Sequence, residues 1–168
     1  MGIIRILALV LTLISWMSDG RVAGVCKTST SNSLTCPPPW LAYQSHCYLW
    51  VDQEMSWQDA DNHCQMLSQL GKMAHLVSIH SAEEDEFISE YVQKASGLSP
   101  PPGYWIGYND RTKEWEFKWV DGSKGTYENW GMNEPNEAGD EDCVERYRVF
   151  NKWNDINCSL RINFVCKM

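Results

Sequence analysis

The chain has 168 residues, a length that fits one folded domain with a short appendage. Its 22 acidic residues outnumber the 14 Lys and Arg residues, which gives a formal net charge of −8. This acidic excess argues against nucleic acid and anionic membrane surfaces as partners. The position of the acids along the chain is therefore more informative than their number.

The N-terminal residues 1–20 have the composition of a secretory signal peptide. Arg5 precedes an apolar run over residues 6–14, and small and polar residues follow it. Cleavage after Gly20 or after Gly24 fits this pattern. A membrane anchor is the alternative, but the run is shorter than the roughly 20 residues that span a bilayer. We expect a secreted, extracellular protein without membrane insertion.

Residues 21–35 are polar and lack hydrophobic periodicity, so we expect a short N-terminal tail that contains Cys26. The folded domain is predicted over residues 36–168. Tyr48 and Trp50 indicate an early strand in it, since aromatic residues are enriched in strands.

Two helices are predicted from their N-terminal capping signals. Ser56 can cap the first, with Asp59 in its first turn and an apolar face that includes Trp57 and Cys64. Residues 81–84 read Ser-Ala-Glu-Glu, a capping box that opens the second helix. Gly97, followed by three prolines, predicts its end.

Beyond Gly103 the periodicity changes to short apolar runs that are typical of strands, at residues 104–108, 117–120, 144–149 and 163–166. Two helices followed by several short strands predict an α+β fold. Residues 121–143 form a long irregular stretch, and loops of this length in compact domains are usually functional or disordered. Tyr127, Trp130 and Met132 argue against disorder, and a bound cation is one way to hold the stretch in place.

Seven cysteines occur after the signal segment, in a compartment where disulfides are stable. They lie at positions 26, 36, 47, 64, 143, 158 and 166. A structural zinc site is disfavoured because there is no CxxC pair with suitably spaced histidines. Six cysteines can pair in 15 ways, and the residues alone do not choose among them.

Five polar residues near the C-terminus form the candidate binding set: Glu134, Asn136, Glu141, Asn154 and Asp155. Their oxygen atoms are the ligands that calcium prefers, whereas zinc favours nitrogen and sulfur and magnesium demands a tighter octahedron. An Asn that coordinates through oxygen keeps its NH2 as a donor, while an ionised Glu can only accept. The pairs Glu134 with Asn136 and Glu141 with Asn154 could each satisfy one hydroxyl of a sugar. Taken singly, the segments are also explained as a turn and a solvated acidic corner.

The chain resembles the C-type lectin-like domain over residues 36–168. The resemblance rests on the cysteine pattern from Cys36 to Cys166 and on four motifs: Trp105-Ile106-Gly107, Glu134-Pro135-Asn136, Glu141-Asp142-Cys143-Val144 and Trp153-Asn154-Asp155. It implies the disulfides Cys36–Cys47, Cys64–Cys166 and Cys143–Cys158, and a cis peptide before Pro135. It also implies that the Glu-Pro-Asn form binds mannose-type sugars with equatorial vicinal hydroxyls, which include mannose, glucose, N-acetylglucosamine and fucose. A second, auxiliary calcium is implied at Asp110, Glu114, Glu137 and Asp142.

Cys26 remains after the six domain cysteines have paired, and an odd cysteine in a secreted protein suggests an interchain bond. We expect a disulfide-linked homodimer or higher oligomer, in which linked sites would raise avidity for glycans on glycoproteins or cell surfaces. A role in glycan recognition or agglutination in innate defence fits such a protein.

Three other functions are weighed against a mannose-type lectin. A glycosidase is disfavoured, because it needs one carboxyl kept protonated whereas metal-bound carboxylates stay ionised. No catalytic residues are predicted. A module of the same fold could bind a protein or another non-sugar target with calcium purely structural. A Glu-Pro-Asn lectin could also prefer galactose-type sugars.

Overall fold

The computed structural model describes residues 35–69, 71–136, 138–148 and 151–168. The predictions for the signal segment, for Cys26 and for Glu137 lie outside these residues. Neither of the two helices in the described part of the chain is long and apolar enough to cross a membrane.

The two helices begin at the predicted caps. α1 (Trp57–Met66) starts after Ser56, whose Oγ accepts the backbone N–H of Asp59 at 3.3 Å. α2 (Ala82–Ser96) starts after Ser81, whose side chain accepts the N–H of Glu84 at 3.2 Å. Gly97 ends α2 with φ of +69°, a left-handed conformation that glycine adopts without a Cβ clash.

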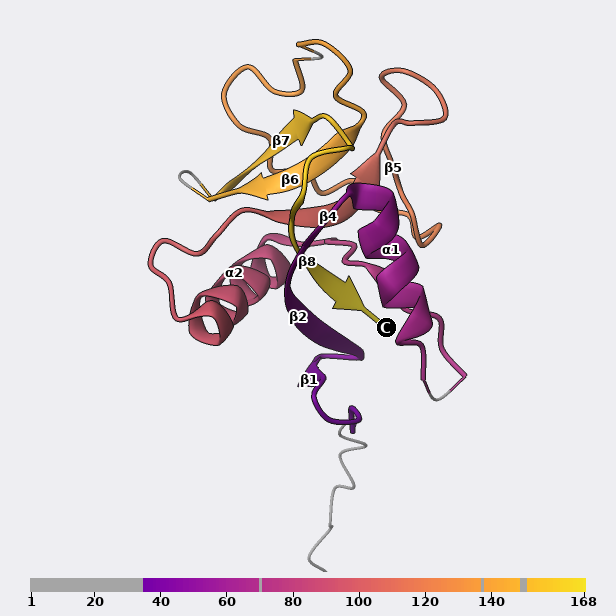
Figure 1. Cartoon of the computed structure of the whole chain (residues 1–168), viewed down its shortest axis with the longest axis vertical. Coiled ribbons are helices and arrows are strands. Elements are labelled where there is room, and N and C mark those ends of the chain that lie inside the picture. Colours follow the sequence, from indigo (N-terminus) through magenta and orange to yellow (C-terminus); the bar gives the residue numbers. More distant parts are fainter. Residues whose placement is uncertain (1–34, 70, 137, 149–150) are drawn as a thin grey trace, which may run out of the picture. The chain divides into compact units, whose positions relative to one another are not determined.

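Within the described residues, the strands form one sheet in the order β1-β2-β8-β4-β6-β7, with β3 pairing β8 and β5 pairing β4 (Figure 1). All pairs are antiparallel except β4 with β8. The strands are β1 (Leu41–Tyr43), β2 (His46–Met55), β3 (His75–Leu76), β4 (Tyr104–Asn109), β5 (Lys118–Trp119), β6 (Cys143–Tyr147), β7 (Lys152–Ile156) and β8 (Ile162–Lys167). The predicted α+β fold is therefore confirmed.

The predicted strand runs correspond to β4, β5, β6 and β8, and the early strand to β2. β7 was not among the predicted strands, because it contains the polar pair Asn154-Asp155 and has no apolar run. Its buried apolar residue is Trp153, whose ring packs edge-on against four aromatic rings with centroids 5.6 to 6.0 Å away, from Tyr108, Trp119, Tyr127 and Trp130. Tertiary packing of one tryptophan, together with pairing to β6, thus makes this segment a strand.

The three disulfides have the pairing that the resemblance implied. Cys36 joins Cys47, Cys64 joins Cys166 and Cys143 joins Cys158, with Cα–Cα distances of 5.7, 5.4 and 5.1 Å. The second ties α1 to β8, and the third connects β6 to the segment that follows β7. The hairpin formed by β6 and β7 is therefore covalently closed at one end.

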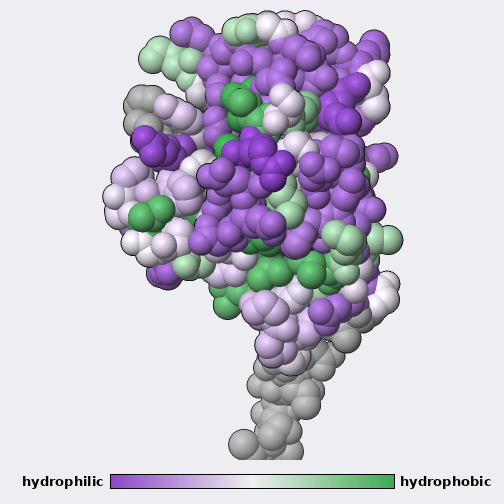
Figure 2. All heavy atoms as spheres, in the orientation of Figure 1, coloured by the Kyte–Doolittle hydropathy of each residue, from purple (hydrophilic) through white to green (hydrophobic). Residues whose placement is uncertain are grey.

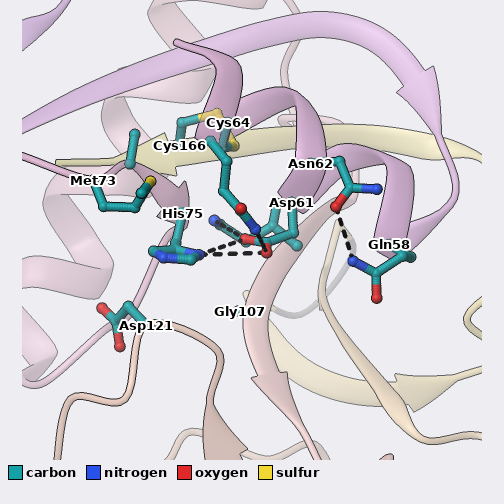
Figure 3. A network of polar contacts seen from close by, with 12 residues as sticks. Gln58, Asp61, Asn62, Cys64, Met73, His75, Gly107, Asp121 and Cys166 are labelled. Atoms are coloured by element: carbon teal, nitrogen blue, oxygen red, sulfur yellow. Dashed lines mark hydrogen bonds and ion pairs between the residues drawn. A yellow bond between two sulfur atoms is a disulfide. The ribbon is translucent and has the colours of Figure 1, made fainter. Parts of the chain in front are cut away.

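A buried carboxylate adds a polar connection beside the Cys64–Cys166 disulfide (Figure 3). Asp61 projects from α1 and accepts the backbone N–H of Leu76 at 3.0 Å and the Nε2 of Gln65 at 2.7 Å. Nδ1 of His75 lies 3.1 Å from the same carboxylate. Asp61 thereby fastens the short strand β3 to α1, which explains how a two-residue strand keeps its place.

A second buried network holds the long irregular stretch against α2. Asp85 of α2 accepts Nε of Arg146 at 2.6 Å, Nδ2 of Asn129 at 2.7 Å and the hydroxyl of Tyr127 at 3.1 Å. The backbone N–H of Trp153 donates to the carbonyl of Asn129 at 2.8 Å. Packing and hydrogen bonds thus anchor the stretch near Tyr127 and Trp130, whereas Met132 is exposed.

Candidate calcium and sugar site

The loop from Gly131 to Glu141 lies beside β7. The N–H of Gly131 donates to the carbonyl of Trp153 at 2.8 Å, which places the loop next to the two residues that follow Trp153. The Glu134–Pro135 peptide is cis, as the resemblance implied. Figure 2 shows hydrophilic residues covering most of the upper part of the molecule, where Figure 1 places β6, β7 and this loop.

Asp155 is the buried carboxylate of the predicted set, with 1% of its surface exposed. Its two oxygens accept the backbone N–H of Asn136 at 3.1 and 3.0 Å. The side-chain amide of Asn136 donates in turn to Glu134. Backbone and side-chain bonds therefore connect three predicted residues, two from the loop and one from β7.

Glu141 reaches the same place from the far end of the loop. The backbone N–H of Ala138 lies 2.8 Å from Oδ1 of Asn136 and 3.0 Å from Oε2 of Glu141, so that both oxygens accept from one donor. The loop is thus folded back on itself, and the side-chain oxygens of Asn136 and Glu141 are close together.

Asn154 projects from β7 and faces strand β6. Its Nδ2 donates to Oε1 of Glu145 at 3.3 Å, and Glu145 is paired with it across the β6–β7 ladder. Asn154 and Glu134 also line the same groove, of about 740 Å³, together with Met132, Tyr147 and Lys152. All five predicted residues are therefore located around one corner of the domain.

The electrostatics of this corner favour a bound cation. The pKa of Glu134 is raised, chiefly by burial and by its hydrogen bond with Asp155, with smaller contributions from the charges of Asp155 and Glu141, while Asn136 opposes the shift. Like charges brought this close disfavour ionisation, and a divalent cation would relieve that cost. Three carboxylates and two carboxamides match the oxygen ligands of calcium.

A closed cage is not present in this arrangement. Within the part of the chain that the structure describes, no three Asp, Glu, His or Cys side chains form a group that could hold a metal ion. The amide nitrogen of Asn136 faces Glu134, and its Oδ1 accepts from Ala138. Calcium binding would therefore require the side chains of Glu134 and Asn136 to turn toward a common centre.

The predicted auxiliary set is brought together in part. Oδ2 of Asp110 accepts the N–H of Trp115 at 2.7 Å, whereas Oδ1 is buried and has no hydrogen-bond partner among the described residues. The N–H of Asp110 donates to the carbonyl of Asp142 at 3.1 Å. Burial raises the pKa of Asp110, and the charges of Glu114 and Asp142 add to the increase, whereas the hydrogen bond from the Trp115 N–H opposes it. A buried, unsatisfied carboxylate oxygen among like charges fits a cation site.

The comparisons with known proteins identify the family. The model of the Lectin C-type domain matches residues 53–168. The chain belongs to the C-type lectin domain family. An α-N-acetylgalactosamine-specific lectin from Patiria pectinifera is 36% identical over 143 residues, which cover 81% of this chain and 84% of that protein.

Solved structures of this family have the same fold. The C-type lectin CEL-I from Cucumaria echinata matches with a TM-score of 0.74 and 29% identity, covering 80% of this chain and 97% of that one. The carbohydrate-recognition domain of cow CD23, solved in the presence of a GlcNAc2Man3 oligosaccharide, matches with a TM-score of 0.68 and 35% identity, covering 80% and 95%.

Sequence reasoning assigned no role to Glu145, although the lectin domain places it against a predicted ligand. Glu145 is 8% exposed, and burial raises its pKa while the bond from Asn154 opposes that shift. The residue lies opposite Asn154 only because β6 and β7 pair in a particular register, which the sequence did not predict. Asp140 also has a role through its carbonyl, which accepts Nδ2 of Asn157 at 2.9 Å.

Proposed function

We propose that this protein is a secreted, calcium-dependent lectin that binds mannose-type sugars without chemical turnover. The observation that carries the proposal is the gathering of Glu134, Asn136, Glu141 and Asp155 in a domain of the C-type lectin family, by hydrogen bonds of Asn136 with Glu134 and Asp155 and by a backbone N–H that Asn136 shares with Glu141. Calcium held by these residues and Asn154 would supply the positive centre to which two neighbouring sugar hydroxyls coordinate.

In the proposed site, different side chains of the set would accept hydrogen bonds from the sugar, donate hydrogen bonds to it or bind the ion alone. Glu134 and Glu141 would accept hydrogen bonds from two hydroxyls, because ionised carboxylates are acceptors only. Asn136 and Asn154 donate to the lone pairs of the same hydroxyls through their NH2 groups. Asp155, buried and bonded to the backbone of Asn136, has no free face for sugar and would act on the ion alone.

The sugar class is the finer part of the proposal. The order of donors and acceptors in Glu134-Pro135-Asn136 favours mannose, and the related cow domain was solved in the presence of an oligosaccharide that contains mannose. The relative from Patiria pectinifera is specific for α-N-acetylgalactosamine, which favours galactose-type sugars as the second candidate.

Competition between sugars tests this choice. The protein is adsorbed to immobilised mannose in calcium and eluted with graded methyl mannoside or N-acetylgalactosamine. We expect mannoside to elute at lower concentration, and the reverse order would assign the galactose class. Adsorption that survives both sugars and EDTA would instead favour a module that binds a protein or another non-sugar target. Turnover of an oligosaccharide would favour a glycosidase.

Acid should release calcium and sugar together, since protons compete for the carboxylates. The pKa of Glu134 lies above its ordinary value of 4.5, so competition begins at a higher pH than for an ordinary Glu. Below that pKa, the apparent calcium affinity should fall about tenfold per pH unit for each proton taken up. Without calcium, acid should instead increase the stability of the fold through this residue. A Glu134 carboxyl with a raised pKa binds its proton more tightly in the folded than in the unfolded chain.

Calcium affinity measured from pH 7.5 to 4 checks this expectation. Sugar binding should decline with the same midpoint when calcium is held fixed, and additional calcium should shift that midpoint to lower pH. A calcium affinity that stays constant over this range would contradict it.

A further inference from the structure

A second pocket, with a volume of about 440 Å³, lies where the beginning of α1, the end of β4 and strand β5 meet. Its lining includes Trp57, Gln58, Asn109, Arg111, Thr112 and Lys118. No residue of the proposed primary or auxiliary calcium set lines it. The volume is within the range of about 300–1,000 Å³ that is usual for small-molecule sites.

The charged residues that line this pocket are both cations. Neither Arg111 nor Lys118 forms an ion pair within the described residues, and no carboxylate lines the pocket. Some exposed cations among the described residues are paired, such as Lys94 with Glu90 and Lys113 with Glu116, whereas Lys72 and Arg161 form no ion pair but line no pocket with a second cation. Two unpaired cations beside one cavity favour an anionic ligand, since such a ligand would supply the missing counter-charge.

Arg111 is held in place by neutral groups. Its guanidinium carbon lies 5.1 Å from the centroid of the Trp57 ring, and its Nη1 donates to Oε1 of Gln58 at 2.7 Å. The Gln58 amide is oriented by its own Nε2, which donates to Oδ1 of Asn62 at 3.1 Å (Figure 3). Gln58 therefore fixes one of the five guanidinium N–H donors without neutralising the charge.

Lys118 lines the pocket from strand β5. In β5 it precedes the buried Trp119, and neighbouring side chains of a strand alternate, so Lys118 is exposed on the other face. Nδ2 of Asn109 donates to the carbonyl of Lys118 at 3.1 Å, which secures the backbone at this point. The N-terminal end of α1, which is the positive end of the helix dipole, also borders this pocket, because Trp57 and Gln58 line it.

We propose that this pocket binds an oxyanion, such as the sulfate or carboxylate group of a charged saccharide, without calcium. Arg111 can present a planar pair of donors to two oxygens, Lys118 contributes a point charge, and Thr112 lines the same pocket with a hydroxyl-bearing side chain. The acidic character of the remaining chain restricts the site to a small anionic group and disfavours a polyanion.

Titration of inorganic sulfate tests the proposal, with the ¹⁵N-labelled protein in EDTA and ionic strength held constant with chloride. We expect saturable shifts of the Trp57 indole N–H and of the Lys118 amide. Lys118→Gln and Arg111→Gln should each weaken sulfate binding about tenfold, the loss expected for one charged hydrogen-bond donor. Lys94→Gln, which removes an exposed lysine on α2, is the matched control and should leave the affinity unchanged.

Three results would overturn the proposal: no saturable shift, equal effects of all three variants, or sulfate binding only in the presence of calcium. The exposed position of Lys118 makes its variant informative even if Arg111→Gln perturbs the packing over Trp57. N-acetylglucosamine 6-sulfate and glucuronic acid then distinguish a sulfate from a carboxylate ligand, with N-acetylglucosamine as the uncharged reference. Because the titration is done in EDTA, failure of the proposed calcium-dependent lectin function would leave this result unaffected.

Discussion

Replacing Asp85 by alanine is expected to lower the free energy of unfolding by about 3–5 kcal/mol, the usual cost of leaving a buried charge without its partner. Asp85 and Arg146 are both buried, and Nε of Arg146 lies 2.6 Å from the carboxylate. The same carboxylate accepts Tyr127 and Asn129, so the change also releases the stretch that packs over Trp153. Urea unfolding in EDTA measures the effect without a contribution from bound calcium.

Glu90→Ala on the same helix provides the control. Glu90 pairs with Lys94 at 3.1 Å, but the two side chains are 61% and 76% exposed. An exposed i,i+4 pair contributes about 0.5 kcal/mol or less. Equal losses from the two variants would show that the Asp85 network does not stabilise the domain as the structure indicates.

Asn154→Asp should reduce sugar affinity by about tenfold or more while calcium affinity changes less. The new carboxylate keeps an oxygen for the ion but loses the NH2 donor that a sugar hydroxyl would accept. Calorimetric titration of calcium and then of methyl mannoside separates the two effects. Equal losses of calcium and sugar affinity would contradict the assignment of Asn154 as a donor to sugar.

Glu145 adds a second consequence to this substitution. In the native protein its Oε1 accepts Nδ2 of Asn154 at 3.3 Å, so the substitution places two carboxylates opposite each other across the β6–β7 ladder. Like charges in this position are destabilising. Combining Glu145→Gln with Asn154→Asp should restore the stability but not the sugar affinity, because the Gln amide can donate to the new carboxylate. Thermal unfolding of the single and double variants in EDTA tests this point.

Local signals predicted much of the fold. Ser56, Ser81 and Gly97 act through their own backbone neighbours, so the helix ends could be predicted from short segments. The strands with apolar runs, such as β4, were also predictable. β7 was not, because Trp153 is its only large apolar residue before Ile156 and the strand depends on aromatic partners distant in sequence.

The candidate site was predictable as a set of residue types, and its connections were not. The Glu-Pro-Asn segment and the Asn154-Asp155 pair indicated calcium chemistry, but the bonds from Asn136 to Asp155 require the loop to fold against β7. The role of Glu145 depends on the register of β6 with β7, and the Arg146–Asp85 pair joins residues 61 positions apart. Such long-range pairings leave no short-range pattern in one sequence.

Direct calorimetric titration of methyl mannoside is the measurement that tests the proposed lectin function most directly. It is done with the protein in saturating calcium and again after exchange into EDTA. The proposed site predicts affinity near the millimolar range in calcium, as is usual for one solvent-exposed sugar, and no measurable heat of binding in EDTA. Equal binding under the two conditions, or no binding of mannoside or N-acetylgalactosamine in calcium, would contradict the proposed calcium and sugar site.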